Sequence, residues 1–290
     1  MSRTTLVDRL FRGTRWAWVA ERHQPDLPRV EDLGAAVMGL DARDRLHSKQ
    51  GRSTARVVFH GLHGPVPVYL KRHFRLPWPT RLAATVRSGG NRTPATAEWA
   101  HLERARALGI RVPEVVAVGE RVGPWGRLQS FLIIAELTGS EALNEVLPRL
   151  RAALDPAAFA RLKRELIAEM ADIVARLHGA RVFHKDLYLC HFYLDLTAQS
   201  APGRRLTLID LHRSGEHRLT PWRWRWKDLG QLLFSTEGVE GVDWHDLLRF
   251  WVAYRRKIRP TWADWQRRRI VTKAARYSEH NRRSAAGGER

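Results

Sequence analysis

Two acidic residues in the C-terminal half have neighbours and a spacing that suit catalysis. Asp186 lies in the segment HKDLYLCHF (residues 184–192), and Asp210 ends a short apolar segment, Leu206–Asp210. In such a layout one carboxylate orients a hydroxyl group and accepts its proton, while the second holds Mg²⁺ against the phosphates of a nucleotide. The pattern therefore indicates phosphoryl transfer, with Asp186 as the catalytic residue and Asp210 as the metal ligand.

One long helix and two short segments are expected to position these residues. Apolar residues recur at helical spacing across Pro156–His178, which predicts an amphipathic helix. Asp186 follows in Val182–Asp195, and Asp210 follows in the next segment. Helical patterns resume at Lys227–Phe234 and Trp244–Lys257.

The N-terminal half is rich in strand patterns. Arg56–His60 and Val66–Leu70 are predicted to be strands joined by a turn, and Val112–Val118 and Phe131–Glu136 to be short buried strands. Residues 94–108 are predicted to form a helix, with proline near its start and glycine past its end.

The order of these elements predicts an α+β chain with two lobes. The N-lobe is expected to be β-rich with one helix, and the C-lobe to be mainly helical. We assign residues 1–44 to an N-terminal extension, 45–137 to the N-lobe, 138–281 to the C-lobe with its basic helical end, and 282–290 to a disordered tail.

The N-terminal half also supplies candidate nucleotide-binding residues. Lys71 ends the sequence VYLK and is placed to contact phosphates, while Glu98, favoured over Glu103, is placed to pair with it. The segment SKQGRST (48–54) has one glycine and no G-x-G-x-x-G pattern. Its backbone amides are still candidates for covering phosphates. The side chains that would assist them are Lys49, Arg52, Ser53 and Thr54.

The segment around Asp186 resembles the protein-kinase catalytic loop, which reads His-Arg-Asp-Leu, three residues and Asn. His191 stands where that Asn would stand, so it is either a metal or phosphate contact or a histidine that braces the loop. His184 is expected to hold the loop through hydrogen bonds to backbone, and Cys190 to pack in the core. Asp228, within Lys-Asp-Leu-Gly, resembles the buried aspartate that supports the kinase loop from a later helix.

The histidine at position 191 narrows the resemblance to one family. HKDLYLCHF (184–192) and IDLHR (209–213) closely resemble motifs of the lipopolysaccharide kinase (Kdo/WaaP, InaA-like) family. Further matches are AEW (97–99), GIRVP (109–113) and the hinge strand FLIIAEL (131–137). The resemblance covers roughly residues 45–255.

The resemblance implies a protein-kinase-like fold and phosphorylation of a sugar hydroxyl by ATP with Mg²⁺. The acceptor would be a heptose or Kdo sugar of the lipopolysaccharide inner core, carried on lipid A. The adenine is expected against the hinge strand, with Glu136 among the cofactor-binding residues. Lys71 would contact the α- and β-phosphates, and Asp210 would hold the metal with the help of His191. An acidic partner, acyl carrier protein, is a further candidate that the family suggests.

Positive charge dominates the composition. The chain has 50 Lys and Arg against 30 Asp and Glu, a formal net charge of +20. Cations concentrate in Lys71–Arg92 and in Arg255–Arg290, and they alternate with tryptophan in WRWRWK (222–227). Such patches attract anionic lipid headgroups or nucleic acid, and tryptophan beside arginine suits a bilayer interface. General use of surface arginine for solubility is an equally good explanation of the basic tail.

The sequence also restricts the compartment. Its single cysteine excludes a disulfide scaffold and a multi-cysteine zinc site. No apolar run approaches the ~20 residues of a membrane span, and the N-terminus lacks the apolar core of a signal peptide. We therefore expect a cytoplasmic protein, and the family resemblance implies that it is peripheral to the inner membrane.

Two alternatives to the glycolipid kinase stay open on the residues alone. One is a kinase-like phosphotransferase for another small molecule or glycan, for instance an antibiotic or a choline-like alcohol. The other is a non-catalytic kinase-like module that binds anionic membrane or nucleic acid. The degenerate glycine segment favours the second, whereas the complete set of Lys71, Asp186 and Asp210 argues against it and makes nucleic acid an improbable partner.

Overall fold

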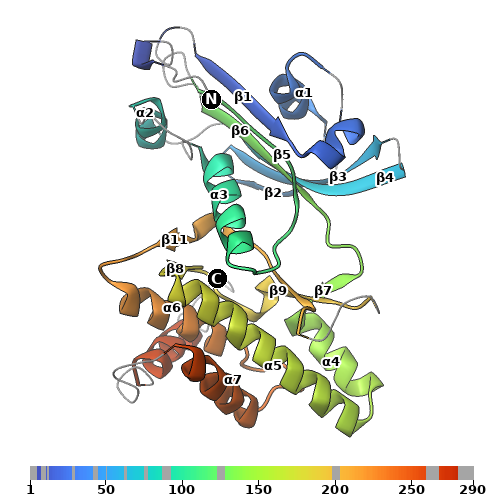
Figure 1. Ribbon diagram of the computed structural model, residues 1–290, viewed down its shortest axis with the longest axis vertical. Coiled ribbons are helices and arrows are strands. Elements are labelled where there is room, and N and C mark those ends of the chain that lie inside the picture. Colours follow the sequence, from blue (N-terminus) through green and yellow to red (C-terminus); the bar gives the residue numbers. More distant parts are fainter. Residues whose placement is uncertain are drawn as a thin grey trace, which may run out of the picture. The chain divides into compact units, whose positions relative to one another are not determined.

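A computed structural model describes residues 5–7, 11, 13–27, 30–41, 45–49, 51–61, 64–74, 78–86, 93–122, 128–197, 203–258 and 268–279. The tail expected at residues 282–290 lies outside them. The chain divides into two compact units, residues 1–103 with 113–137, and residues 104–112 with 138–290. The first contains an antiparallel sheet and the second is mostly helical, so the predicted α+β class is confirmed (Figure 1).

The first unit is built on a six-stranded sheet with the order β1-β5-β6-β4-β3-β2, antiparallel throughout (Figure 1). Its strands are β1 (Thr14–Val19), β2 (Arg45–Lys49), β3 (Arg52–Gly61), β4 (Gly64–His73), β5 (Val115–Val122) and β6 (Leu128–Ala135). The unit also contains η2 (Glu21–Asp26), α1 (Leu33–Gly39), α2 (Trp78–Val86) and the larger part of α3 (Pro94–Ala107). Helix α1 packs against β1, β5 and β6 and closes a core around Phe131, Ile133 and Leu70.

Strand β1 lies within the stretch that the sequence alone assigns to an N-terminal extension. All six of its residues pair with β5, from Thr14 opposite Val122 to Val19 opposite Ala117. The sequence TRWAWV is rich in aromatic and β-branched residues, which are enriched in strands. Residues 14–19 are therefore an integral part of the sheet, and Trp16 and Trp18 contact Trp99 of α3 through their rings.

The basic run Lys71–Arg92 is not wholly a surface for polyanions, because Arg72 is buried. Its side chain is almost fully buried, and Nη1 donates to the carbonyl oxygens of Val37, Met38 and Leu40, where α1 ends. A cation at a helix C-terminus is favourable because the last carbonyl groups have no helical partner. Arg72 therefore joins α1 to β4 and is no part of a surface for polyanions.

The second unit consists mainly of helices and also contains two small sheets. In chain order its elements are β7 (Ser140–Ala142), α4 (Leu143–Ala153), α5 (Pro156–Gly179), β8 (Val182–Phe183), η3 (Leu189–His191), β9 (Phe192–Asp195), β10 (Leu206–Leu208), η4 (Leu211–Arg213), β11 (Gly215–Glu216), α6 (Pro221–Phe234) and α7 (Trp244–Lys257). Residues 268–279 are also helical. Helices α5 and α7 pack side by side (Figure 1).

Helix α5 begins at Pro156, as its apolar spacing predicts. The Asp155 carboxylate accepts from the amides of Ala157 and Ala158 at 3.0 Å, and Pro156 occupies the first helical position. Farther along, the buried Glu169 carboxylate accepts from the amides of Arg205 and Leu206. These two bonds fix the start of β10, the strand that leads to Asp210.

Candidate active site

In the first unit, Lys71 and Glu98 form an ion pair. Lys71 lies on β4, and its Nζ is 2.6 Å from Oε1 of Glu98 on α3. The Glu98 side chain is only 5% exposed, so its charge requires a cationic partner. The expected pair is therefore present, and it involves Glu98, the residue favoured over Glu103.

The Glu136 carboxylate is engaged within the sheet. Arg56 on β3 donates to both of its oxygens, from Nε at 2.9 and 3.1 Å and from Nη2 at 2.8 Å. These hydrogen bonds lower the pKa of Glu136, although burial opposes them. The Glu136 amide donates to the carbonyl oxygen of Pro67. A nucleotide contact at this position would therefore come from its backbone carbonyl group.

The segment SKQGRST forms the end of β2 and the start of β3. Gly51 has a φ of 72°, a conformation that favours glycine, and its carbonyl oxygen accepts from the Phe74 amide at 2.7 Å. Arg52 is exposed, whereas Ser53 is buried. Of these two candidates Arg52 is accessible to a ligand. The side chain of Lys49 lies outside the described residues, although its backbone pairs with Arg52.

In the second unit, Asp186 is held between cationic and amide groups. Nη1 of Arg213 lies 3.1 and 2.9 Å from its two carboxylate oxygens, and Nζ of Lys227 lies 3.7 Å from Oδ1. Nε2 of Gln231 donates to the same Oδ1 at 3.3 Å and to the Tyr188 hydroxyl at 2.9 Å. This arrangement fixes the direction of the carboxylate, which a proton acceptor requires.

Asp228 anchors the loop that carries Asp186. It is fully buried on α6, and its two oxygens accept from the amides of His184 and Lys185, each at 2.8 Å. Lys185 has a φ of 70°, an uncommon conformation for a residue with a side chain. The two bonds hold this strained backbone in place, so the expected supporting role of Asp228 is present in the structure.

A buried chain of hydrogen bonds extends this support to α5 and α7. Nε2 of His178 lies 3.3 Å from Oδ2 of Asp228, and its Nδ1 lies 2.8 Å from the Tyr254 hydroxyl. Burial lowers the pKa of His178 and raises that of Tyr254, so both groups stay neutral. One consistent assignment has Tyr254 donating to Nδ1 and Nε2 donating to Asp228.

His184 and His191 join the loop to the strand before Asp210. Nε2 of His184 donates to the Ile209 carbonyl oxygen at 3.0 Å, and burial lowers the pKa of this imidazole. Nδ1 of His191 donates to the Asp186 carbonyl oxygen at 2.7 Å. Both histidines therefore brace the loop, as expected for His184. Cys190 is half-buried, and burial raises the pKa of its thiol.

Asp210 combines a special backbone with two imidazole neighbours. Its φ of 62° places it in the left-handed region, Oδ1 lies 2.6 Å from Nδ1 of His212, and Oδ2 lies 3.6 Å from Nε2 of His191. Nε2 of His191 therefore faces the Asp210 carboxylate, and a cation bound there would be stabilised by that carboxylate.

The donor set fits Mg²⁺ only if a substrate supplies further ligands. In the described part of the chain, no three His, Cys, Asp or Glu side chains converge on one point where a metal ion would fit. Mg²⁺ is commonly held by one or two carboxylates, waters and substrate phosphates. Asp210 is suited to such a partial site.

The sequence model of the Lipopolysaccharide kinase (Kdo/WaaP) family matches residues 41–251. The chain belongs to this family. The lipopolysaccharide core heptose(I) kinases WaaP of Pseudomonas aeruginosa and Escherichia coli K12 are 38% identical over 164 residues and 34% identical over 162 residues. These alignments cover 56% and 55% of the chain and 60% and 59% of the relatives, so they span about three fifths of each relative's own length.

Relatedness within the family extends to structure. A solved structure described as WaaP in complex with acyl carrier protein has 29% sequence identity and a TM-score of 0.64. The match covers 93% of this chain and 98% of that one. The kinase-like fold implied by the family motifs is thus confirmed.

Three partners of Asp186 were not identified from the sequence. Arg213 stands within the family motif IDLHR, three residues after Asp210, and Lys227 immediately precedes Asp228. Gln231 follows Asp228 by three residues, so it lies one helical turn away on the same face of α6. The sequence places these residues near Asp210 and Asp228, which is the one sign of their role that it offers. Only the fold shows that their side chains converge on Asp186.

Proposed function

We propose that this chain transfers the γ-phosphoryl group of ATP to a heptose or Kdo hydroxyl of the lipopolysaccharide inner core. The main support for this proposal is the position of the Asp186 carboxylate, which contacts Arg213, Lys227 and Gln231. The loop that carries Asp186 is anchored by the buried Asp228. The names of the WaaP relatives support the sugar acceptor. Residues 45–137 would act as the nucleotide-binding lobe and residues 138–281 as the catalytic lobe.

In this mechanism the side chains position groups and neutralise charge. Asp186 orients the acceptor hydroxyl and takes its proton as the bond to phosphorus forms. Lys71, held by Glu98, stabilises the α- and β-phosphates, and Arg52 is available to cover them. Asp210, with His191 beside it, would hold Mg²⁺, which supplies charge neutralisation on the transferring group when bound. Such positioning and electrostatic stabilisation account for most of the rate in phosphoryl transfer.

The proposed activity is tested by ADP release with Mg²⁺ and a panel of acceptors. The panel contains a heptose-bearing core on lipid A, a Kdo-only lipid A, an aminoglycoside and choline. Release stimulated only by the core acceptors supports the proposal. Stimulation by the aminoglycoside or choline instead would identify another phosphotransferase, and ATP binding without turnover would favour a binding module.

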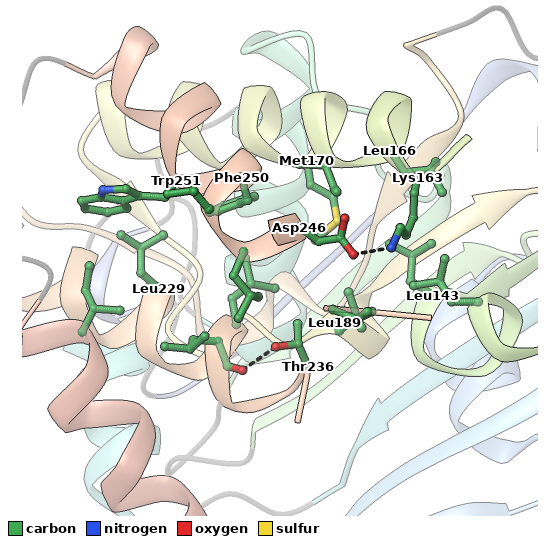
Figure 2. A pocket seen from close by; sticks show the side chains of 18 of the residues that line it. Leu143, Lys163, Leu166, Met170, Leu189, Leu229, Thr236, Asp246, Phe250 and Trp251 are labelled. Carbon is green, nitrogen blue, oxygen red and sulfur yellow. Dashed lines mark hydrogen bonds and ion pairs between the residues drawn. The ribbon is translucent and has the colours of Figure 1, made fainter. Parts of the chain in front are cut away.

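We also propose acyl carrier protein as a partner, and an apolar pocket of the second unit is the specific support. The pocket has a volume of about 320 Å³ and is lined by residues of α4, α5, α6, α7 and 268–279. Figure 2 shows Leu143, Leu166, Met170, Leu189, Leu229, Phe250 and Trp251 around it. The solved relative is described as a complex with acyl carrier protein. An acyl chain is the ligand that such walls would accept.

The polar groups of the pocket satisfy one another. Nζ of Lys163 lies 2.5 Å from Oδ2 of Asp246, and the Thr236 hydroxyl donates to the Leu233 carbonyl oxygen at 2.7 Å (Figure 2). No lone charge therefore demands a polar ligand at these positions. The last turn of α7 carries Arg255, Arg256 and Lys257, which suit an acidic carrier protein.

Filling the pocket should remove acyl-chain recognition. The change Leu233→Trp is expected to abolish a preference of about 10-fold or more for acylated over unacylated carrier protein, because each buried methylene contributes ~0.8 kcal/mol. Calorimetry on both carrier forms measures this preference. Leu154→Trp, at an exposed leucine outside the pocket, is the matched control and should leave it intact. A preference that survives Leu233→Trp would exclude the pocket as the acyl site.

Peripheral binding to an anionic membrane is the third part of the proposal. Among the described residues, no helix is both long and apolar enough to span a bilayer. Helix α2 instead presents Trp78, Leu82 and Val86, which are 65%, 51% and 57% exposed. Their spacing of four places them along one side of the helix. An apolar stripe within the basic run Lys71–Arg92 suits a headgroup interface.

Removing this stripe should weaken vesicle binding. The double change Trp78→Ser and Leu82→Ser is expected to lower affinity for phosphatidylglycerol vesicles by at least about 10-fold, since each apolar side chain contributes ~1.5–3 kcal/mol when buried. Cosedimentation measures the affinity. Leu219→Ser with Val252→Ser removes two exposed apolar residues elsewhere and should have little effect. Equal losses in the two double variants would show that α2 is not the membrane-binding element.

A further inference from the structure

A basic basin lies beside Asp186 in the second unit. Its volume is about 530 Å³. Five cations and two aromatic residues line it, namely Lys185, Arg213, Arg223, Trp224, Lys227, Lys273 and Tyr277. Arg213 and Lys227 are also the cations that contact the Asp186 carboxylate, at 2.9 and 3.7 Å. The basin therefore adjoins the group that would receive the acceptor's proton.

The positive charge of the basin is poorly compensated. No ion pair with any residue that the structure describes is formed by Lys185, Arg223 or Lys273. Burial lowers the pKa of Lys185 and Lys273, and neighbouring cations lower each of them further. Positive charges held close together repel one another, and a bound anion would relieve this repulsion.

The backbone and ring packing hold these cations in place. Lys185 has a φ of 70°, and its Nζ lies 5.0 Å from the centre of the Trp224 ring. His217 stacks on the same ring at 4.3 Å with an interplanar angle of 16°. A Cβ atom at Gly215 would lie 2.6 Å from Nζ of Lys185, so glycine lets this side chain take its present position without shifting. A strained backbone beside a catalytic loop is a common mark of function.

We propose that this basin binds a negative charge carried by the acceptor itself, a phosphate or carboxylate group on the sugar near the hydroxyl that is phosphorylated. Two guanidinium groups suit bidentate contact with such an anion, while the lysines add point charges. The inference rests on the proposed kinase function, because it takes Asp186 as the site of the acceptor hydroxyl. It adds a requirement that the acceptor be anionic before the reaction starts.

The test removes two of the three basin cations that do not contact the Asp186 carboxylate. Arg223→Gln with Lys273→Gln is expected to raise the KM for a phosphorylated or Kdo-bearing core acceptor by about 10- to 100-fold, with kcat and the KM for ATP changed by less than about twofold. Arg161→Gln with Arg164→Gln removes the same charge from exposed positions and should leave all constants unchanged. Equal effects of the two double variants would overturn the proposal, as would a raised KM for ATP alone.

Acceptor chemistry distinguishes the source of the anion. Two further acceptors are compared, one stripped of phosphate and one lacking the Kdo carboxylate. On the acceptor that lacks the recognised group, the KM of the basin variant should no longer exceed that of the original chain. A deficit that persists on both acceptors contradicts the proposal.

A binding measurement separates this inference from the kinase function. Inorganic phosphate is titrated into the full chain without nucleotide and followed by calorimetry. Binding weakened at least about fivefold by the basin substitutions, and not by the control substitutions, supports the basin even if no acceptor is turned over. Equal phosphate affinity in all three proteins would overturn the inference without touching the proposed phosphoryl transfer.

Discussion

Asp186→Ala is expected to lower kcat by about 1000-fold while leaving the affinity for ATP within about threefold of that of the original chain. The carboxylate is the group that accepts the hydroxyl proton in the proposed mechanism. Asp186→Asn should be similarly impaired, since it keeps the shape of the side chain but not its basicity. Single-turnover kinetics with a core acceptor, together with equilibrium ATP binding, measure the two quantities.

The matched control is Asp172→Asn on α5. Asp172 also pairs with two cations, Arg176 and Lys257, but it lies outside the loop that carries Asp186. Its loss should alter stability slightly, as for other exposed ion pairs, and leave kcat unchanged. Full activity of Asp186→Ala would remove the assignment of Asp186 as the proton acceptor.

Asp228→Ala should have the largest effect on stability. The change strands two buried amides, at His184 and Lys185, and the imidazole of His178. Each unsatisfied buried donor costs ~1–3 kcal/mol, so we expect the free energy of unfolding to fall by about 3–5 kcal/mol. Urea unfolding followed by circular dichroism measures this difference.

Asp228→Asn distinguishes the effect of Asp228 on the catalytic loop from its effect on the stability of the fold. The amide keeps one acceptor but turns an NH₂ group towards the other donor, so kcat should fall about 10- to 100-fold in protein that remains folded. Asp246→Asn is the control, because Asp246 is also buried but pairs with Lys163 and Arg249. It should lose stability with little change in kcat. Equal kcat in the two variants would contradict a special role for Asp228.

Much of this site could be predicted from the sequence, because its residues lie in short motifs. Local patterns around Asp186, Asp210 and Asp228 indicate the loop, the strand and the supporting helix, and the structure brings Asp228 to the loop as expected. Helix α5 could be predicted over Pro156–His178 because its apolar residues recur at helical spacing, and the structure places it at Pro156–Gly179.

Other features depend on contacts that no local pattern reveals. Strand β5 begins at Val115 rather than Val112 because Pro113 lacks an amide hydrogen, and it continues to Val122 through pairing with β1 and β6. Arg72 belongs to a basic run but is buried under α1, where three carbonyl oxygens accept from it. The basic basin draws residues from 185 to 277 together, so its composition is a property of the fold.

The most direct test of the central claim is transfer of labelled phosphate from γ-labelled ATP to a heptose-bearing lipopolysaccharide core by the full chain. The proposed mechanism predicts that label enters the core as a phosphate monoester on a sugar hydroxyl, and that Asp186→Ala abolishes this transfer while still binding ATP. Bound ATP whose label reaches only water, or transfer that continues in Asp186→Ala, would contradict it.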